Sequence, residues 1–149
     1  GNMKYKGISE IRTEVGKIYA LSLRESGFTD GIDVIIPVPL HSSKRRKRGF
    51  NQSESISDGI ASVTGIKVDT GSLVRTSASA TQTKKSRYER STHVEGIFKL
   101  AFPENVRGRH ILLVDDVITT GSTIESCVNE LQKAGDVKVS VAALAYADL

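Results

Sequence analysis

The chain has 149 residues, of which 38% are hydrophobic and 26% are charged, and its formal net charge is +4. Such a composition is typical of one globular domain with a hydrophobic core, and no apolar run is long enough to cross a membrane. Cys127 is the only cysteine, which excludes a disulfide framework and a zinc site built from several thiolates. We therefore expect a single domain over residues 1–149 in a reducing, cytoplasmic setting, with no membrane segment.

The first predicted element is an amphipathic helix over residues 8–26, because apolar residues recur there mostly at helical spacing. Ser9 is its expected amino-terminal cap, and Gly27 is expected to end it. Residues 33–40 then form a short, nearly continuous apolar run, which predicts a strand buried on both faces. Pro37 and Pro39 end that strand, since proline cannot donate to a sheet ladder.

Five consecutive cations occupy residues 44–48. The run permits three interpretations, namely a nucleic-acid patch, a phosphate or pyrophosphate clamp, or a solvated loop. It follows the carboxyl end of a predicted buried strand, where open α/β sheets place their ligands, and this favours a functional role. Asn51 or Ser53 is the expected cap of a helix that reaches about Val63.

Short strands are predicted at residues 66–69, 73–75 and 97–100. Between the last two lies a segment, residues 76–92, that contains almost no apolar side chain. So long a polar segment within a compact domain is either disordered decoration or a functional lid. Its cations suit a lid over an anionic ligand, and they are Lys84, Lys85, Arg87 and Arg90.

The last third of the chain alternates strand, helix and strand. A buried strand is predicted at residues 111–114, a helix at 122–133 that Gly135 stops, and a final buried strand at 137–145. Cys127 falls within the helix, where we expect it to pack rather than to react. The alternation predicts a three-layer α/β fold, with a mostly parallel sheet and helices on both faces.

Residues 111–123 join the buried strand to the start of that helix. Asp115 and Asp116 follow the apolar run, and a polar turn with one glycine leads into the helix. Backbone amides at a helix amino terminus form an anion site, to which phosphate is well suited. The residues of this turn are Thr119, Thr120, Gly121, Ser122 and Thr123. The carboxylates suit ribose hydroxyls or a divalent cation beside the phosphate, so the stretch predicts a sugar-phosphate ligand.

The stretch from Val114 to Thr123 resembles the phosphoribosyl pyrophosphate (PRPP) motif of type I phosphoribosyltransferases. The likeness covers the apolar strand, the Asp-Asp pair and the Thr-Thr-Gly-Ser-Thr turn. Further segments resemble the competence protein F (ComF) branch of that superfamily, which is amidophosphoribosyltransferase-like. These segments are residues 4–7, 37–41, 48–53, 81–82 and 89–90. Two departures stand out: His93 replaces an asparagine of the family, and the family's cysteine-rich ribbon is absent, which implies a carboxyl-terminal domain truncated at its amino end.

The resemblance implies a type I phosphoribosyltransferase fold and a binding scheme for PRPP. Asp115 and Asp116 would be the catalytic residues and would hold the ribose hydroxyls, while residues 119–123 would bind the 5-phosphate. The pyrophosphate-binding residues would be Pro39, Leu40, His41 and Arg48. The lid would contribute Gln82, Lys84, Arg87 and Arg90. Mg²⁺ would arrive with the ligand, and Asp115 and Asp116 are the protein groups placed to meet it.

Two functions remain open at this stage. The first is transfer of a 5-phosphoribosyl group from PRPP to an unidentified amine or base, with release of pyrophosphate. The second is a non-catalytic accessory role in DNA uptake, with the basic run contacting competence proteins or single-stranded DNA. Aromatic residues make up only 5% of the chain, which disfavours direct single-strand binding because that needs stacking platforms. The oligomeric state stays open, and we expect the three histidines to be structural or surface residues.

Overall fold

The computed structural model describes residues 8–40, 51–76 and 97–147. Its main sheet contains four parallel strands in the order β2-β1-β5-β6. Their bounds are β1 Val34–Pro37, β2 Lys67–Val68, β5 His110–Ile118 and β6 Lys138–Tyr146. A separate antiparallel ribbon pairs β3, Leu73–Arg75, with β4, Phe98–Leu100. All of the predicted strands are therefore present, and β5 runs past its apolar part through both carboxylates.

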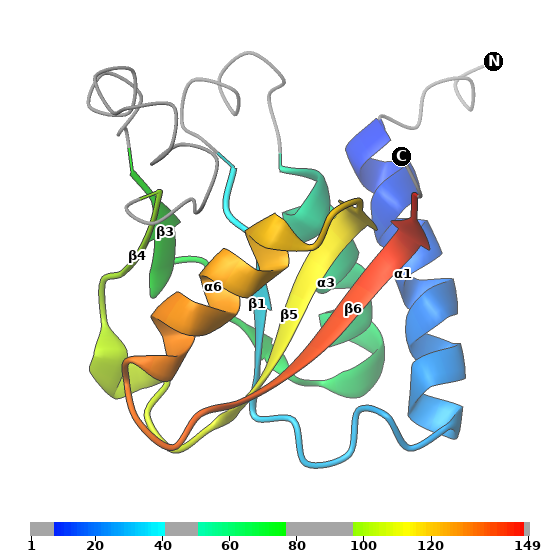
Figure 1. Cartoon of the computed structure of the whole chain (residues 1–149). Helices are drawn as coiled ribbons and strands as arrows, with labels where there is room; N and C mark the ends of the chain where they lie inside the picture. Colours follow the sequence, from blue (N-terminus) through cyan, green and yellow to red (C-terminus); the bar gives the residue numbers. More distant parts are fainter. Residues whose placement is uncertain (1–7, 41–50, 77–96, 148–149) are drawn as a thin grey trace, which may run out of the picture.

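Helices cover both faces of the main sheet (Figure 1). Their bounds are α1 Ile8–Glu25, α3 Gln52–Thr64 and α6 Ser122–Gln132, and a short 3-10 helix, Pro103–Asn105, precedes β5. Alternation along the strands separates two buried clusters. Ile111 and Leu113 share one cluster with Leu131 of α6, whereas Leu112 and Val114 share the other with Ile60 of α3. The predicted three-layer α/β fold is thus confirmed.

The end of α1 agrees with the sequence better than its start does. Gly27 has a positive φ of 82°, its N–H donates to the Arg24 carbonyl, and the N–H of Phe28 donates to the Leu23 carbonyl. This pair of bonds is the Schellman arrangement, which satisfies the last helical carbonyls. The prediction for Ser9 was wrong, because α1 already begins at Ile8 and Ser9 lies inside its first turn. None of the helices in the described ranges is long and apolar enough to span a bilayer.

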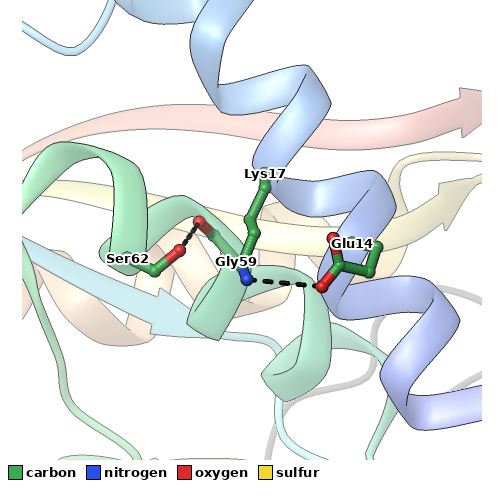
Figure 2. Close-up of polar contacts among 4 residues, drawn as sticks. All are labelled: Glu14, Lys17, Gly59 and Ser62. Atoms are coloured by element: carbon green, nitrogen blue, oxygen red, sulfur yellow. Dashed lines mark hydrogen bonds and ion pairs between the residues drawn. The ribbon is translucent and has the colours of Figure 1, made fainter.

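Two glycines let α1 and α3 cross at very short range. A Cβ on Gly16 would lie 2.7 Å from the Ile56 carbonyl oxygen, and one on Gly59 would collide with the Thr13 carbonyl oxygen. Figure 2 shows this crossing, with Lys17 of α1 paired to Glu14 at 3.3 Å and Ser62 of α3 bonded to the Gly59 carbonyl. The exposed ion pair contributes little. The glycines therefore fix how close α3 lies to α1, and with it the position of the amino terminus of α3.

Candidate functional site

The carboxyl ends of β1 and β5 form the edge of the sheet where the predicted site residues gather. Val38 donates its N–H to the Val114 carbonyl at 2.8 Å, so the two strands stay in register up to this edge. The acidic pair follows Val114 on β5, and Val38, Pro39 and Leu40 follow the end of β1. Ligands of open α/β sheets bind at this edge, so the topology brings the two predicted half-sites together.

The first hollow, which we name the loop pocket, has a volume of about 70 Å³. A single stretch of chain between the end of β5 and the first turn of α6 lines it. Its residues are Asp115, Val117, Ile118, Thr119, Thr120, Gly121, Ser122, Thr123 and Ile124. The predicted turn therefore does surround a cavity at the amino terminus of α6.

The geometry of the loop pocket suits an anion. Gly121 has a φ of 84°, which side chains disfavour, and this conformation lets the strand turn directly into the helix. The first helical bond runs from the Glu125 N–H to the Gly121 carbonyl at 2.9 Å. The amides of residues 122–124 consequently precede the helical ladder, with only the Ser122 N–H bonded to a side chain, the Thr120 hydroxyl at 3.3 Å. The Thr120 and Ser122 hydroxyls also bond to each other at 3.0 Å.

Asp115 is the carboxylate that lines the loop pocket. Its Oδ1 accepts a bond from the Asp116 N–H at 2.9 Å and another from the Ser53 hydroxyl at 3.4 Å. Burial, with the neighbouring Asp116 charge adding to it, raises the pKa of Asp115 from 3.8 to about 6. The Asp116 side chain turns back on its own strand, since its Oδ1 accepts from the Val117 N–H at 2.9 Å. Asp116 is not one of the pocket-lining residues, so the two carboxylates differ in their placement.

Asn51 ties the start of α3 to the end of β1. Its Oδ1 accepts from the backbone N–H groups of Ser53 at 2.8 Å and Glu54 at 3.4 Å, which caps the helix as predicted. Its Nδ2 donates to the Val38 carbonyl at 3.2 Å. Asn51 and Ser53 are both buried, with 6% and 4% of their surface exposed. A chain of hydrogen bonds therefore runs from Val38 through Asn51 and Ser53 to Asp115.

The second hollow, which we name the proline pocket, has a volume of about 180 Å³. Four separate parts of the chain meet there: the end of β1, the start of α3, the turn after β2, and β3. The lining residues are Pro37, Pro39, Leu40, Asn51, Glu54, Thr70, Leu73, Val74 and Arg75. Pro39 and Leu40 were predicted site residues, and Arg75, Glu54 and Thr70 were not.

Most of the predicted residues divide between the two pockets and the undescribed ranges, whereas Asp116 is described on β5 and lines neither pocket. Asp115 and residues 119–123 meet in the loop pocket, and Pro39 and Leu40 lie in the proline pocket. The other predicted residues, together with the basic run and the 77–92 part of the lid, lie outside the described residues. They are His41, Arg48, Gln82, Lys84, Arg87 and Arg90.

Cys127 and His110, for which the sequence predicted structural roles, line neither of the two pockets. Cys127 is fully buried, and burial raises the pKa of its thiol to about 12, so it packs as a small apolar group. The His110 Nε2 bonds to the Ser140 hydroxyl at 2.7 Å, at the amino end of β5 and away from both pockets.

Within the described ranges, no group of three or more His, Cys, Asp or Glu side chains is arranged to hold a metal ion. Mg²⁺ does not require such a cage, since it commonly binds through one or two carboxylates together with phosphates of the substrate. Asp115 lines the loop pocket beside the turn that was predicted to bind phosphate, and Asp116 is the next residue on β5. These residues therefore fit a magnesium ion that a phosphorylated ligand brings with it.

Residues 20–148 match the family described as phosphoribosyl transferase domain. DNA utilization protein YhgH of Escherichia coli O6:H1 is 34% identical over 142 residues, which cover 93% of this chain and 62% of that protein. Competence protein F of Haemophilus influenzae is 30% identical over 97% of this chain and 65% of its own length. The chain thus spans about three fifths of the length of these relatives.

Solved structures show the same fold. The glutamine PRPP amidotransferase from B. subtilis superposes with a TM-score of 0.65 at 24% identity, over 93% of this chain and 27% of that one. An adenine phosphoribosyltransferase superposes with a TM-score of 0.58 at 14% identity, over 91% of this chain and 69% of that one. The resemblance read from the sequence is therefore confirmed, and the architecture is that of type I phosphoribosyltransferases.

Proposed function

Because the chain belongs to the phosphoribosyl transferase domain family, we propose that it binds PRPP and transfers the 5-phosphoribosyl group to a nitrogen acceptor. The observation that carries this proposal is the loop pocket. It joins an anion nest at a helix amino terminus to a carboxylate within one continuous stretch, residues 115–124. A ligand with a sugar diol next to a phosphate would fit this pocket, with the phosphate at the helix amino terminus and the diol at the carboxylate.

Each part of the site has a distinct task in this proposal. The hydroxyls and amides of residues 119–123 bind the 5-phosphate, and Asp115 accepts hydrogen bonds from the ribose hydroxyls together with Asp116. Pro39 and Leu40 place the diphosphate at the edge of β1. His41 and Arg48 assist them, and Gln82, Lys84, Arg87 and Arg90 close over the ligand to exclude water. Mg²⁺, when bound with PRPP, offsets part of the diphosphate charge.

The reaction breaks one bond at the anomeric carbon and forms another. The C–O bond to the diphosphate breaks with its electron pair leaving on the diphosphate, and the acceptor nitrogen gives its lone pair to the same carbon. The proton displaced from that nitrogen passes to water or to the diphosphate. The transition state resembles an oxocarbenium ion, as in glycosyl transfer generally, so the protein contributes mainly positioning and charge stabilisation.

The direct test is titration calorimetry of the protein with PRPP in the presence of magnesium. We expect saturable heat with PRPP, and a loss of most of that heat when EDTA removes the metal. A folded protein that gives no heat at millimolar PRPP would contradict the site assignment. Release of pyrophosphate with a panel of amines and bases then tests transfer itself.

A second function is favoured by the names of the relatives, which refer to DNA utilization and competence. In that case the domain is an accessory protein of DNA uptake that keeps a PRPP-binding fold, and residues 44–48 contact competence proteins or single-stranded DNA. Salt-sensitive DNA binding without pyrophosphate release favours this function. Pyrophosphate release with any acceptor favours the transferase. We place either function in the cytoplasm, as the single reduced cysteine suggests.

A further inference from the structure

The Ser53 hydroxyl has one hydrogen-bond partner among the described residues, and that partner is a carboxylate of the candidate site. It donates to Oδ1 of Asp115 at 3.4 Å, from helix α3 to strand β5. We propose that Ser53 is a positioning residue of the site, whose hydroxyl holds the Asp115 carboxylate in the orientation that meets the ribose of PRPP. The proposal rests on the transferase function given above and names a residue on which its ribose contacts depend.

The two oxygens of the Asp115 carboxylate have different surroundings. Oδ1 accepts from the Ser53 hydroxyl and from the Asp116 N–H, the latter at 2.9 Å, so donors from two separate parts of the chain meet at one atom. Oδ2 accepts no hydrogen bond from any residue in the described ranges. Because two donors hold Oδ1, the carboxylate keeps one orientation, and Oδ2 is the acceptor left for a ligand hydroxyl in the loop pocket.

Ser53 is held in place independently of Asp115. Its N–H donates to Oδ1 of Asn51 at 2.8 Å, and Asn51 is bonded in turn to the Val38 carbonyl. Only 4% of the surface of Ser53 is exposed, and α3 shares one buried apolar cluster with β5. The hydroxyl therefore comes from a rigid part of the fold, which a positioning contact requires.

Helix capping does not account for the Ser53 hydroxyl. A serine near the amino terminus of a helix commonly caps it with its own side chain. In α3 the cap is Asn51, which accepts from the N–H groups of Ser53 and Glu54, and the Ser53 hydroxyl bonds to another element. Since the cap uses only the backbone of Ser53, the S53A variant removes the contact with Asp115 and leaves the cap intact.

The neighbouring carboxylate is oriented by a different contact. Oδ1 of Asp116 accepts from the Val117 N–H at 2.9 Å within its own strand, and the Ser53 hydroxyl bonds to Asp115 instead. Loss of that hydroxyl should therefore disturb one carboxylate of the pair, while the phosphate-binding turn keeps its structure. This selectivity separates a positioning role from a general effect on the fold.

Two ligands distinguish an effect on the ribose contacts from an effect on anion binding. PRPP needs both the turn and Asp115, whereas inorganic phosphate makes no ribose contact. Each is titrated by calorimetry in magnesium buffer into the wild type, S53A, S53T and the control S57A. Ser57 is fully buried on the same helix, and within the described ranges its hydroxyl has no hydrogen-bond partner. S57A thus removes the same group from α3 without removing a contact.

We expect S53A to lower the affinity for PRPP about five-fold, the usual size of one lost hydrogen bond. Affinity for phosphate should change less than about two-fold, and S57A should resemble the wild type with both ligands. S53T keeps the hydroxyl and should restore most of the PRPP affinity. Thermal unfolding checks each variant. If the extra methyl group of S53T prevents folding, S53C takes its place, and its thiol, a weaker donor, should give an intermediate affinity.

A double-mutant cycle with D115A tests whether Ser53 acts through Asp115. Without its acceptor the hydroxyl has no carboxylate to orient, so adding S53A to D115A should change the PRPP affinity less than about two-fold. If D115A binds PRPP too weakly to measure, the comparison of PRPP with phosphate in S53A decides the question.

Four results would overturn the inference while the proposed function stands. S53A could bind PRPP as the wild type does, or a folded S53T could bind it no better than S53A. The other two are an equal loss for PRPP and phosphate, and an equal effect of S53A with and without Asp115, since both would mean that Ser53 acts through the fold. A folded wild type that binds phosphate but not PRPP would instead reject the proposed function, before any variant is measured.

Discussion

The loop pocket and the proline pocket lie at the same edge of the sheet, but the chain builds them differently. The loop pocket comes from one stretch, residues 115–124, in which a strand ends, turns and starts a helix. The proline pocket comes from β1, α3, β3 and the turn before β3, which approach one another only in the folded chain. Local sequence therefore specifies the first pocket, and tertiary packing specifies the second.

This difference predicts how substitutions in each pocket affect stability and ligand affinity. Changes within the loop pocket should abolish ligand contacts and leave the fold intact, because few other elements depend on its side chains. Changes that affect the proline pocket should alter stability and affinity together, because the pocket exists only where α3, β1 and β3 pack in their folded positions. Four variants test this contrast, in order of decreasing effect.

The largest effect is expected for the double substitution D115A and D116A. It removes both acceptors for the ribose hydroxyls, so PRPP affinity should fall at least about 100-fold. Thermal stability should stay nearly unchanged, since both carboxylates lie on the last part of β5, beyond its buried apolar residues, where Asp115 lines the loop pocket. Calorimetry measures the affinity, and a thermal melt measures the stability. Retained affinity would make the carboxylates structural groups, against the proposed role.

The next effect is expected at the helix crossing, for G59A. The new methyl group would collide with the Thr13 carbonyl oxygen and lie 2.8 Å from the Lys17 backbone nitrogen, so α1 and α3 must move apart. We expect the free energy of unfolding to fall by about 3 kcal/mol, although alanine is the better helix former. Urea denaturation measures the change.

S62A is the matched control for G59A on the same helix. Ser62 is exposed, and its hydroxyl bonds only to the Gly59 carbonyl of its own helix (Figure 2). Its loss should change stability by less than about 0.5 kcal/mol. Equal stabilities for G59A and S62A would mean that the two helices do not cross as closely as described.

The contrast between the pockets also explains what the sequence reveals. Apolar spacing located the three α-helices and the strands of the described ranges to within a few residues, because it records which side faces the core, but it did not predict the short 3-10 helix Pro103–Asn105. The motif at residues 115–123 could be recognised in the sequence because its carboxylates and its phosphate-binding turn are neighbours along the chain. The place of Arg75 in the proline pocket could not be recognised in the sequence, since it depends on the pairing of β3 with β4, which sets the guanidinium carbon 5.3 Å from the centre of the Phe98 ring. Ser9 illustrates the remaining limit, as capping residues and first-turn residues look alike in sequence.

A third effect, of moderate size, is expected for N51A. The change removes the cap of α3 and leaves the buried Val38 carbonyl without its donor, and together these should cost about 2 kcal/mol of stability. N51S separates the two causes, because serine still caps a helix but is too short to reach Val38. Urea denaturation should therefore place N51S between N51A and the wild type. If N51S matched N51A, the cap would contribute nothing and the bond to Val38 everything.

The smallest effect concerns Asp115 and pH. Its folded pKa of about 6 lies above the unfolded value of 3.8, so the folded protein binds the extra proton between these values. The stability that the protonated group contributes is complete below the unfolded pKa and is lost as pH rises through about 6. D115N keeps an oxygen for Ser53 and for the Asp116 N–H but never ionises. Relative to wild type, D115N should gain stability as pH rises from about 4 to 7.

The gain should be about 1 kcal/mol, because the carboxyl is partly exposed and solvent screens its charge. Urea denaturation in EDTA at several pH values measures it without any contribution from metal. D30N, which removes an exposed carboxylate at the other side of the fold, is the control variant. A flat difference between D115N and wild type would mean that Asp115 ionises freely. A gain accompanied by lost PRPP affinity would instead mean that the loop pocket keeps a destabilising charge at neutral pH because its ligand requires one.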